Sequence, residues 1–222
     1  MNTGLDFPLA GMTLTALPSG ALWWAHRQLL CVSDLHLGKS DRIARRSGAL
    51  IPPYEVRETL ARLEKDIETT AASTVICLGD SFDDLSAADS LDEDEKLWLT
   101  RLQAGRRWIW IEGNHDPGPV EFGGSHMADF SEGPLTFRHI ADPDQTGEIS
   151  GHYHPKTRVV VRGKVISRRS LLFDQDRVIV PAYGTYTGGL RSDERVLQSL
   201  MGDGAHAILT GSVPRMIPMP KG

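Results

Sequence analysis

The sequence of 222 residues has little cysteine and no long hydrophobic run. Its two cysteines, Cys31 and Cys77, lie inside apolar segments, which indicates reduced, buried thiols rather than a disulfide framework. No stretch approaches the roughly 18 apolar residues that a membrane span needs, and the first residues lack the basic and apolar regions of a secretory signal. We therefore expect a cytoplasmic protein that does not associate with a membrane.

The chain also lacks an excess of positive charge. Its formal net charge of −5 argues against a uniformly positive surface, so binding to a nucleic acid would depend on local basic patches. Basic residues crowd two segments, which hold Lys39, Arg42, Arg45 and Arg46 in the first and Lys156, Arg158, Arg162, Lys164, Arg168 and Arg169 in the second. A mixture of solvated charged faces accounts for the same pattern.

Strand and helix patterns alternate in the first half of the chain. Apolar content predicts strands over residues 21–25, 29–33, 74–78 and 108–111. One helix is predicted over residues 53–70 from an apolar stripe at helical spacing. A second helix begins at a capping box of Ser90 and Glu93 and stops near Gly105. Such alternation builds a parallel sheet through right-handed crossovers.

The second half has a different character, because short β runs follow one another with little helical periodicity. This pattern predicts a second sheet, and no internal repeat or linker divides the chain. We therefore predict an α/β fold in which two mixed sheets pack face to face with helices outside, a four-layer α/β/β/α sandwich. The whole chain, residues 1–222, is predicted to form one domain.

Polar motifs follow the predicted strands at the points where the strands end. The D-x-H motif places Asp34 and His36 after one strand, and a GD pair places Asp80 after the next. Further motifs follow later strands, and these are GNHD at 113–116, FRHI with His139, and GHYHP with His152 and His154. Ligands of open α/β sheets bind outside the carboxyl ends of the strands, so we expect these side chains to converge on one crevice.

The donor set suits divalent metal ions. Two carboxylates, one amide oxygen and four imidazoles favour manganese, iron or zinc, and thiolates are absent from the set. One ion would not use seven ligands, whereas two ions that share a bridging aspartate would. Two such ions stand roughly 3.5 to 4 Å apart and clamp both oxygens of a phosphoryl displacement. The cofactors expected are therefore two divalent ions, manganese first, with iron or zinc as alternatives.

The ordered set D-x-H, GD, GNHD, a lone histidine and GHxH resembles the calcineurin-like metallophosphoesterase family. This resemblance implies that the first metal is held by Asp34, His36, Asp80 and His154, and the second by Asp80, Asn114, His139 and His152. In this assignment, which the resemblance implies, Asp80 bridges the two metal ions. The resemblance further implies that His115 donates to the phosphate or leaving group, and that Asp116 orients the ring of His115.

The longer segments SDLHLGKS, GALIPPYEVRETLARL, LGDSFDD, EGNHD, GHYHP and PAYGTYTGG resemble the bacterial ligase-associated DNA damage response endonucleases. Members of that subfamily often carry histidine where this chain has Asp83. The resemblance implies a phosphodiesterase or endonuclease that acts in DNA repair, with a DNA ligase or helicase as partner. Asp83 and Asp84 either hold ligating imidazoles in orientation or are simple turn carboxylates.

Several residues near the motifs are candidate substrate contacts. The basic residues Lys39, Arg42, Arg45 and Arg46 follow the D-x-H motif and would steer a phosphate backbone, although a solvated surface explains them too. Tyr183 and Tyr186, in the glycine-rich PAYGTYTGG loop, would stack a base, with packing or turn roles as the alternative.

The function predicted from these residues is hydrolysis of phosphodiesters by a metal-bound hydroxide assisted by His115, with DNA as the leading substrate. Two alternatives stay open. One is a small-molecule phosphodiesterase or pyrophosphatase that acts on nucleotides or nucleotide-linked lipids. The other is a noncatalytic scaffold that keeps the metal site for stability and serves a repair complex.

Overall fold

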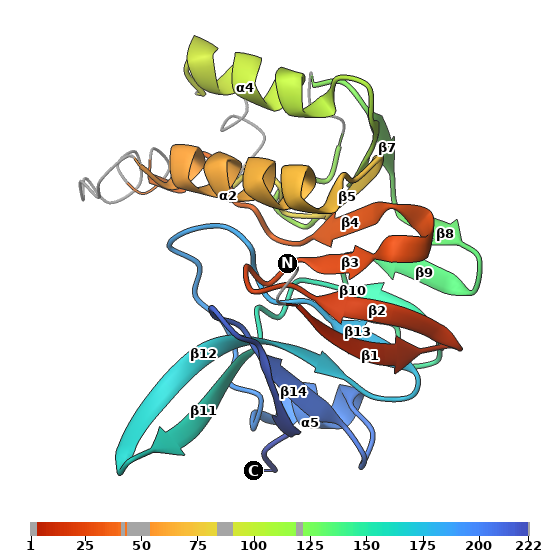
Figure 1. Cartoon of the computed structure of the whole chain (residues 1–222), viewed down its shortest axis with the longest axis vertical. Helices are drawn as coiled ribbons and strands as arrows, with labels where there is room; N and C mark the ends of the chain where they lie inside the picture. The colour runs from red at the N-terminus through yellow and green to blue at the C-terminus, as the bar shows by residue number, and fades with distance from the viewer. Residues whose placement is uncertain (1–3, 41–42, 44–53, 84–90, 119–121, 222) are drawn as a thin grey trace.

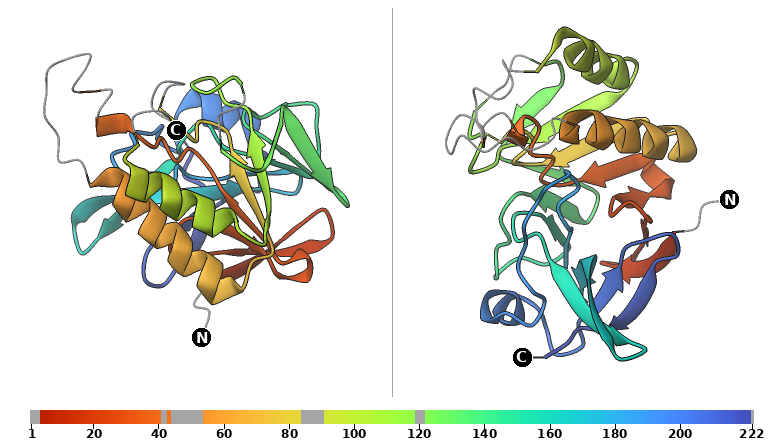
Figure 2. Two further views of the ribbon diagram at one scale, coloured as in Figure 1. Left: turned by 90° about the horizontal axis from the view of Figure 1, so that it is seen from above. Right: turned by 90° about the vertical axis from the view of Figure 1, so that its left-hand side faces the viewer.

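The computed structural model describes residues 4–40, 43, 54–83, 91–118 and 122–221. Two β-sheets stack face to face, with α2 (Glu55–Thr70) and α4 (Glu93–Gln103) against the first sheet and α5 (Arg195–Leu200) against the second (Figures 1 and 2). The four-layer α/β/β/α sandwich predicted from the sequence is therefore confirmed. That the chain forms a single domain stays a prediction.

The first sheet supplies the strand ends that matter for the site. Its order is β1 (Leu5–Leu9), β2 (Met12–Ala16), β3 (Leu22–Trp24), β4 (Leu29–Val32), β5 (Thr74–Leu78), β6 (Arg107–Ile111) and β7 (Ser125–Met127). β4 to β7 run parallel, in a register that pairs Val32 with Cys77 and Cys77 with Trp110. The carboxyl ends of β4, β5 and β6 therefore meet at one edge, as the alternating pattern predicted.

The second sheet is mixed. Its order is β15 (Arg215–Pro218), β14 (His206–Leu209), β12 (Lys164–Phe173), β13 (Arg177–Ile179), β10 (Glu148–Ser150), β9 (Leu135–Arg138) and β8 (Asp129–Glu132), while β11 (Lys156–Val161) pairs with β12. β10 runs parallel to both β9 and β13, so the loops after β9 and β10 leave the same edge.

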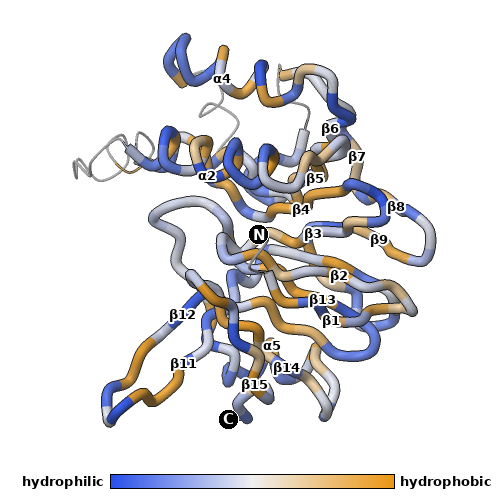
Figure 3. Tube along the Cα trace, viewed as in Figure 1, coloured by the Kyte–Doolittle hydropathy of each residue, from blue (hydrophilic) through white to orange (hydrophobic). Residues whose placement is uncertain are grey.

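Apolar strands and one helical stripe form the core, and Figure 3 shows hydrophobic stretches along the strands of both sheets. Between the sheets, buried side chains such as Cys31, Ile76 and Phe137 pack together. The predicted stripe of α2 faces the other side of the first sheet, and its members Val56, Leu60, Leu63 and Ile67 are at most 5% exposed. Burial of each such side chain contributes about 1.5–3 kcal/mol, which holds α2 over the sheet.

Two sequence predictions need correction at the helix starts. The capping box of α4 consists of Asp92 and Glu95, because Asp92 Oδ1 accepts from the backbone N–H of Glu95 at 2.8 Å and Glu95 returns the bond. Ser90 lies outside the described residues, as does Pro53, the first residue of the helix predicted over 53–70. The predicted strand 21–25 ends earlier, at Trp24, because Ala25–Arg27 form a 3-10 turn (η1).

The predicted state of the cysteines is confirmed, since Cys31 and Cys77 are both free and buried. Among the described residues, no helix has the length and apolar character that crossing a membrane would require.

Candidate metal centre

Five of the predicted metal ligands have a strained backbone conformation. Of the described residues other than glycine, ten have a positive φ, and five of these are Asp34, His36, Asp80, His152 and His154, with φ between 46° and 68°. A side chain in this left-handed region costs on the order of 1–3 kcal/mol, so it persists only where the surrounding structure fixes it. The loops after β4, β5 and β10 are therefore built to direct these side chains.

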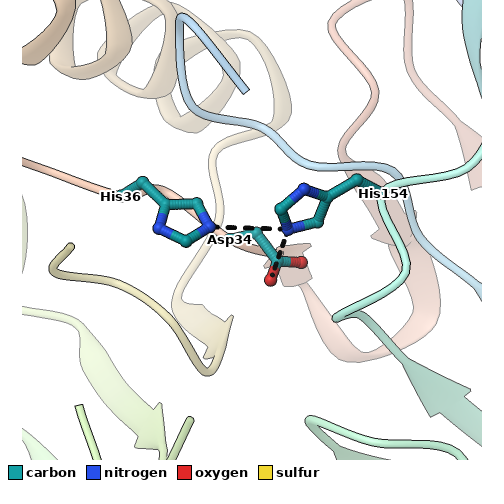
Figure 4. Close-up of side chains that lie close together, drawn as sticks. All are labelled: Asp34, His36 and His154. Carbon is teal, nitrogen blue, oxygen red and sulfur yellow. Dashed lines mark hydrogen bonds and ion pairs between the residues drawn. The ribbon is translucent and has the colours of Figure 1, made fainter. Parts of the chain in front are cut away.

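One group of ligand atoms joins the loops after β4 and β10. Asp34 Oδ1 lies 3.0 Å from His154 Nε2, and His36 Nε2 lies 3.5 Å from the same nitrogen. Figure 4 shows the two rings with a nitrogen of each directed toward the other, and the carboxylate of Asp34 next to the nitrogen of His154. One ligand atom from each of the three residues lies within 4.8 Å of the others, which is the spacing of a metal site.

A second group joins the loops after β5, β9 and β10. His139 Nε2 lies 3.4 Å from Asp80 Oδ2 and 3.2 Å from His152 Nδ1. The side-chain oxygen of Asn114 is 3.0 Å from the same His139 nitrogen. Gly79 allows this approach, because a Cβ at that position would stand 2.5 Å from the ring of His139. All seven predicted ligands thus fall in or beside two groups at one edge.

Asp34 connects the groups. Its Oδ2 accepts the backbone N–H of His152 at 3.0 Å, and its Oδ1 lies 4.0 Å from His139 Nδ1. Asp80 belongs to the second group and not to the first, whose carboxylate is Asp34. The bridging role of Asp80 stays a prediction.

These residues fit a metal ion. Asp34 Oδ1 is fully buried and accepts no regular hydrogen bond from the described residues, and its contact with His154 Nε2 at 3.0 Å is that of an ion pair. His139 Nδ1 lies 2.8 Å from the carbonyl oxygen of Leu78, which directs Nε2 into the second group. An imidazole held through one nitrogen presents the lone pair of the other, as metal-binding histidines do. The buried carboxylates and oriented imidazoles therefore suit divalent cations.

Burial and mutual contacts set the electrostatics of both groups. Burial raises the pKa of Asp80, but the side chain of His139 and the backbone N–H of His115 outweigh it and lower that pKa to about 2. Burial lowers the pKa of His36, although Asp83 opposes this effect. Asp80 is thus an anion and His36 a neutral imidazole at neutral pH, the states that bind metal.

His115 lies at the rim of both groups. Its Nδ1 is 2.8 Å from the carbonyl oxygen of Asp83, and its Nε2 is 4.0 Å from Asp80 Oδ2. The ring contacts that of His36 edge to face, with centroids 5.1 Å apart. With 30% of its side chain exposed, His115 is accessible to a substrate at the edge of the sheet.

The contacts of Asp116 are with backbone N–H groups, and its orientation of the His115 ring stays a prediction. Its carboxylate accepts four backbone N–H groups, from Asp80 and Gly113 at Oδ1 and from Ser81 and Phe82 at Oδ2, at 2.8–3.1 Å. Buried carboxylates satisfy such orphan donors efficiently. Asp116 therefore ties the loop after β6 to the loop after β5 and holds Asp80 in its strained conformation.

The candidate substrate contacts divide into three kinds. Lys39 Nζ lies 3.5 Å from Asp83 Oδ1, close to the first group. Arg42, Arg45 and Arg46 lie outside the described residues. Tyr186 is 44% exposed, whereas Tyr183 is fully buried and donates a hydrogen bond to Asp66 at 2.9 Å. The stacking role predicted for Tyr183 is therefore wrong, because its ring offers no open face to a base.

Two supports were not identified by sequence reasoning. Ser33 donates a short hydrogen bond to Asp34 Oδ2. The backbone N–H groups of Tyr183 and Gly184 bond to the carbonyls of Ser33 and Asp34 at 2.7 and 3.1 Å. The glycines of PAYGTYTGG were the sequence signal for this close backbone contact, because a Cβ on Gly184 would collide with the carbonyl oxygen of Leu35.

Two comparisons with known proteins find similarity to this chain. The model of the family described as calcineurin-like phosphoesterase matches residues 27–211, which include every predicted ligand. Among solved structures, the chain is similar to that of the Pseudomonas putida nuclease MPE, with a TM-score of 0.74 and 23% identity over 96% of this chain and 100% of that one. At this identity the likeness shows a common fold. No curated protein matches.

Proposed function

We infer that this chain, which belongs to the calcineurin-like phosphoesterase family, is a nuclease that hydrolyses phosphodiester bonds of DNA. The observation that carries this inference is the convergence of two Asp/His groups where loops of both sheets meet, Asp34, His36 and His154 beside Asp80, His139 and His152. The fold that it shares with a nuclease supports a nucleic acid as substrate.

Two divalent cations fit this edge, with manganese favoured over iron or zinc. We assign the first to Asp34, His36, Asp80 and His154, and the second to Asp80, Asn114, His139 and His152. When bound, such a pair polarises the phosphoryl oxygens and makes a coordinated water more acidic. The protein contributes the orientation of its ligands, through Leu78, Asp83 and Asp116 behind them.

His115 is the group that we assign to proton donation. Its contact with the carbonyl oxygen of Asp83 places a proton on Nδ1, because a carbonyl only accepts. Nε2 then carries a proton only when the ring is cationic, and this N–H faces the space beside Asp80. In that form it would stabilise the developing negative charge on the phosphate or on the leaving oxygen.

We further propose that the reaction serves DNA repair in the cytoplasm, beside a DNA ligase or helicase. The support is the resemblance of SDLHLGKS, LGDSFDD and PAYGTYTGG to ligase-associated endonucleases.

The function is tested by measuring, with manganese present, the hydrolysis of an aryl phosphodiester and of DNA substrates with defined ends. His115→Ala and Asp80→Ala should each lower kcat by about 10²–10⁴-fold with the circular dichroism spectrum retained. His26→Ala, at an exposed position outside both groups, is the control and should retain full turnover.

The alternatives give different results in the same assay. Faster hydrolysis of dinucleotides or nucleotide-linked lipids than of DNA would identify a small-molecule phosphodiesterase. Metal binding without hydrolysis of any of these substrates would leave the noncatalytic scaffold as the remaining hypothesis.

A further inference from the structure

The basic segment at 156–169 forms an arm that the candidate metal centre does not use. β11 and the first part of β12 pair with each other and extend beyond the body of the second sheet (Figure 1). The arm carries six basic side chains, Lys156, Arg158, Arg162, Lys164, Arg168 and Arg169, although the whole chain has a net charge of −5. Figure 3 shows hydrophilic stretches on either side of its apolar residues.

A groove lies where the arm joins the body. Its volume is about 620 Å³, and its lining includes four cationic side chains, those of Arg62, Lys156, Arg168 and Arg169. Ser19, Ser167 and Thr210 line it as well. Among the described residues that line the groove there is no carboxylate, so the cavity combines positive charge with hydrogen-bond donors.

The cations in the groove repel one another. Burial lowers the pKa of Arg169, and Arg62 lowers it further, although Glu58 opposes the effect. An anion placed among these groups would relieve the repulsion, because opposite charge within a few ångströms favours the charged form.

Rigid contacts hold this charge in place. The guanidinium of Arg169 donates to the carbonyl oxygens of Tyr183 and Gly184 at 3.2 and 2.7 Å. Lys156 Nζ donates to the carbonyl oxygen of Thr187 at 3.1 Å, and Arg62 donates to Thr185 Oγ1 at the same distance. A preorganised cationic groove loses less side-chain entropy when it binds an anion.

The chain itself and a series of hydrogen bonds connect the groove with the candidate metal centre. β11 begins at Lys156, two residues after His154. Gly184, whose carbonyl accepts from Arg169, donates its own N–H to the carbonyl oxygen of Asp34 at 3.1 Å. Gly184 therefore links a cation of the groove to the loop that carries Asp34.

We propose that this groove and the arm bind the phosphate backbone of a polynucleotide at a distance from the bond that is cut. The proposal rests on the proposed nuclease function and specifies its substrate as a long polyanion rather than a dinucleotide. Cations and hydroxyls contact phosphates without reading bases, so this binding is independent of sequence and weakens with salt.

Charge reversal at exposed positions tests the surface. Arg168→Glu at the groove and Arg158→Glu on the arm change side chains that are exposed, and Arg195→Glu on α5 makes the same charge change elsewhere. The readout is fluorescence anisotropy of a labelled single-stranded oligonucleotide with manganese over a salt series, with its integrity checked on a gel. Cleavage of the oligonucleotide and of a dinucleotide is measured beside it.

The expected result is a roughly five- to tenfold loss of oligonucleotide affinity for each arm variant, with recovery in Arg168→Lys. The slope of log affinity against log salt should become shallower by about 0.7 for each lost phosphate contact. Arg195→Glu should match the unchanged protein. An equal loss in Arg195→Glu, or none in the arm variants, would overturn the proposal.

Two further outcomes distinguish phosphate binding by the arm from apolar binding and from the nuclease function. If Val160→Ser and Val165→Ser weaken binding and the charge variants do not, an apolar contact replaces the one proposed, since these side chains are 71% and 67% exposed. If the unchanged protein cleaves no phosphodiester but binds the oligonucleotide through the arm, the nuclease function fails and the surface stands.

Discussion

Nδ1 of His36 lies 2.8 Å from Oδ1 of Asp83, and the two side chains are only 3% and 1% exposed. The other nitrogen of the same ring, Nε2, points at His154 in the first metal group. A carboxylate behind an imidazole fixes its orientation and increases its basicity toward a metal. Of the two interpretations of Asp83 that the sequence left open, the structure thus favours support of a ligand over a simple turn.

Asp83→Ala should therefore weaken metal binding without removing a ligand. We expect manganese affinity to fall by about 10- to 100-fold, the usual effect of losing such a partner. Isothermal titration calorimetry measures this, with Asp129→Ala as the control, because Asp129 is 60% exposed on β8. Unchanged affinity in Asp83→Ala would show that His36 needs no support.

Asp116→Ala should act on stability first. Four backbone N–H groups would lose their acceptor, at a cost of at least about 3 kcal/mol in the free energy of unfolding. Urea denaturation measures it, and Asp144→Ala, at an exposed loop position, should change stability by less than about 0.5 kcal/mol. If the two variants unfold alike, Asp116 does not hold the two loops together.

Motif order predicted the site better than it predicted the supports behind it. Asp34 and Asp80 were predictable because each follows a strand of the first sheet, and the parallel register brings these strand ends to one edge, while His154 follows β10 of the second sheet. The partners of Asp116 were not, since a carboxylate that accepts backbone N–H groups leaves no trace in the identity of those residues. The burial of Tyr183 likewise depends on the packing of α2, which no local pattern reveals.

The two tyrosines of the PAYGTYTGG loop should behave differently on substitution. Tyr183→Phe removes the hydroxyl that donates to the largely buried Asp66, so we expect a loss of about 1–3 kcal/mol in stability and no change in DNA affinity. Tyr186→Ala, at a 44% exposed position, should leave stability nearly unchanged. Thermal denaturation measures the stability of each variant, and fluorescence anisotropy measures its affinity for DNA. A selective loss of DNA binding in Tyr183→Phe would contradict the packing role.

The metal-free protein should lose stability in acid through Asp80. Its folded pKa of about 2 lies below the ordinary value of 3.8, so its ionised form is stabilised by folding. That contribution, about 2 kcal/mol at most, is present above pH 4 and disappears as the pH falls through about 2. Urea denaturation in EDTA should show this slope, and Asp80→Asn should flatten it. Parallel curves for both proteins would rule out the linkage.

The proposed chemistry depends on a pair of metal ions held by the two Asp/His groups. A crystal soaked in manganese, with anomalous scattering recorded at the manganese edge, reveals such ions directly. We expect two peaks roughly 3.5 to 4 Å apart, one among Asp34, His36 and His154 and one among Asp80, His139 and His152. No peak at this edge of the sheet, or peaks only at other places on the molecule, would contradict the proposed centre.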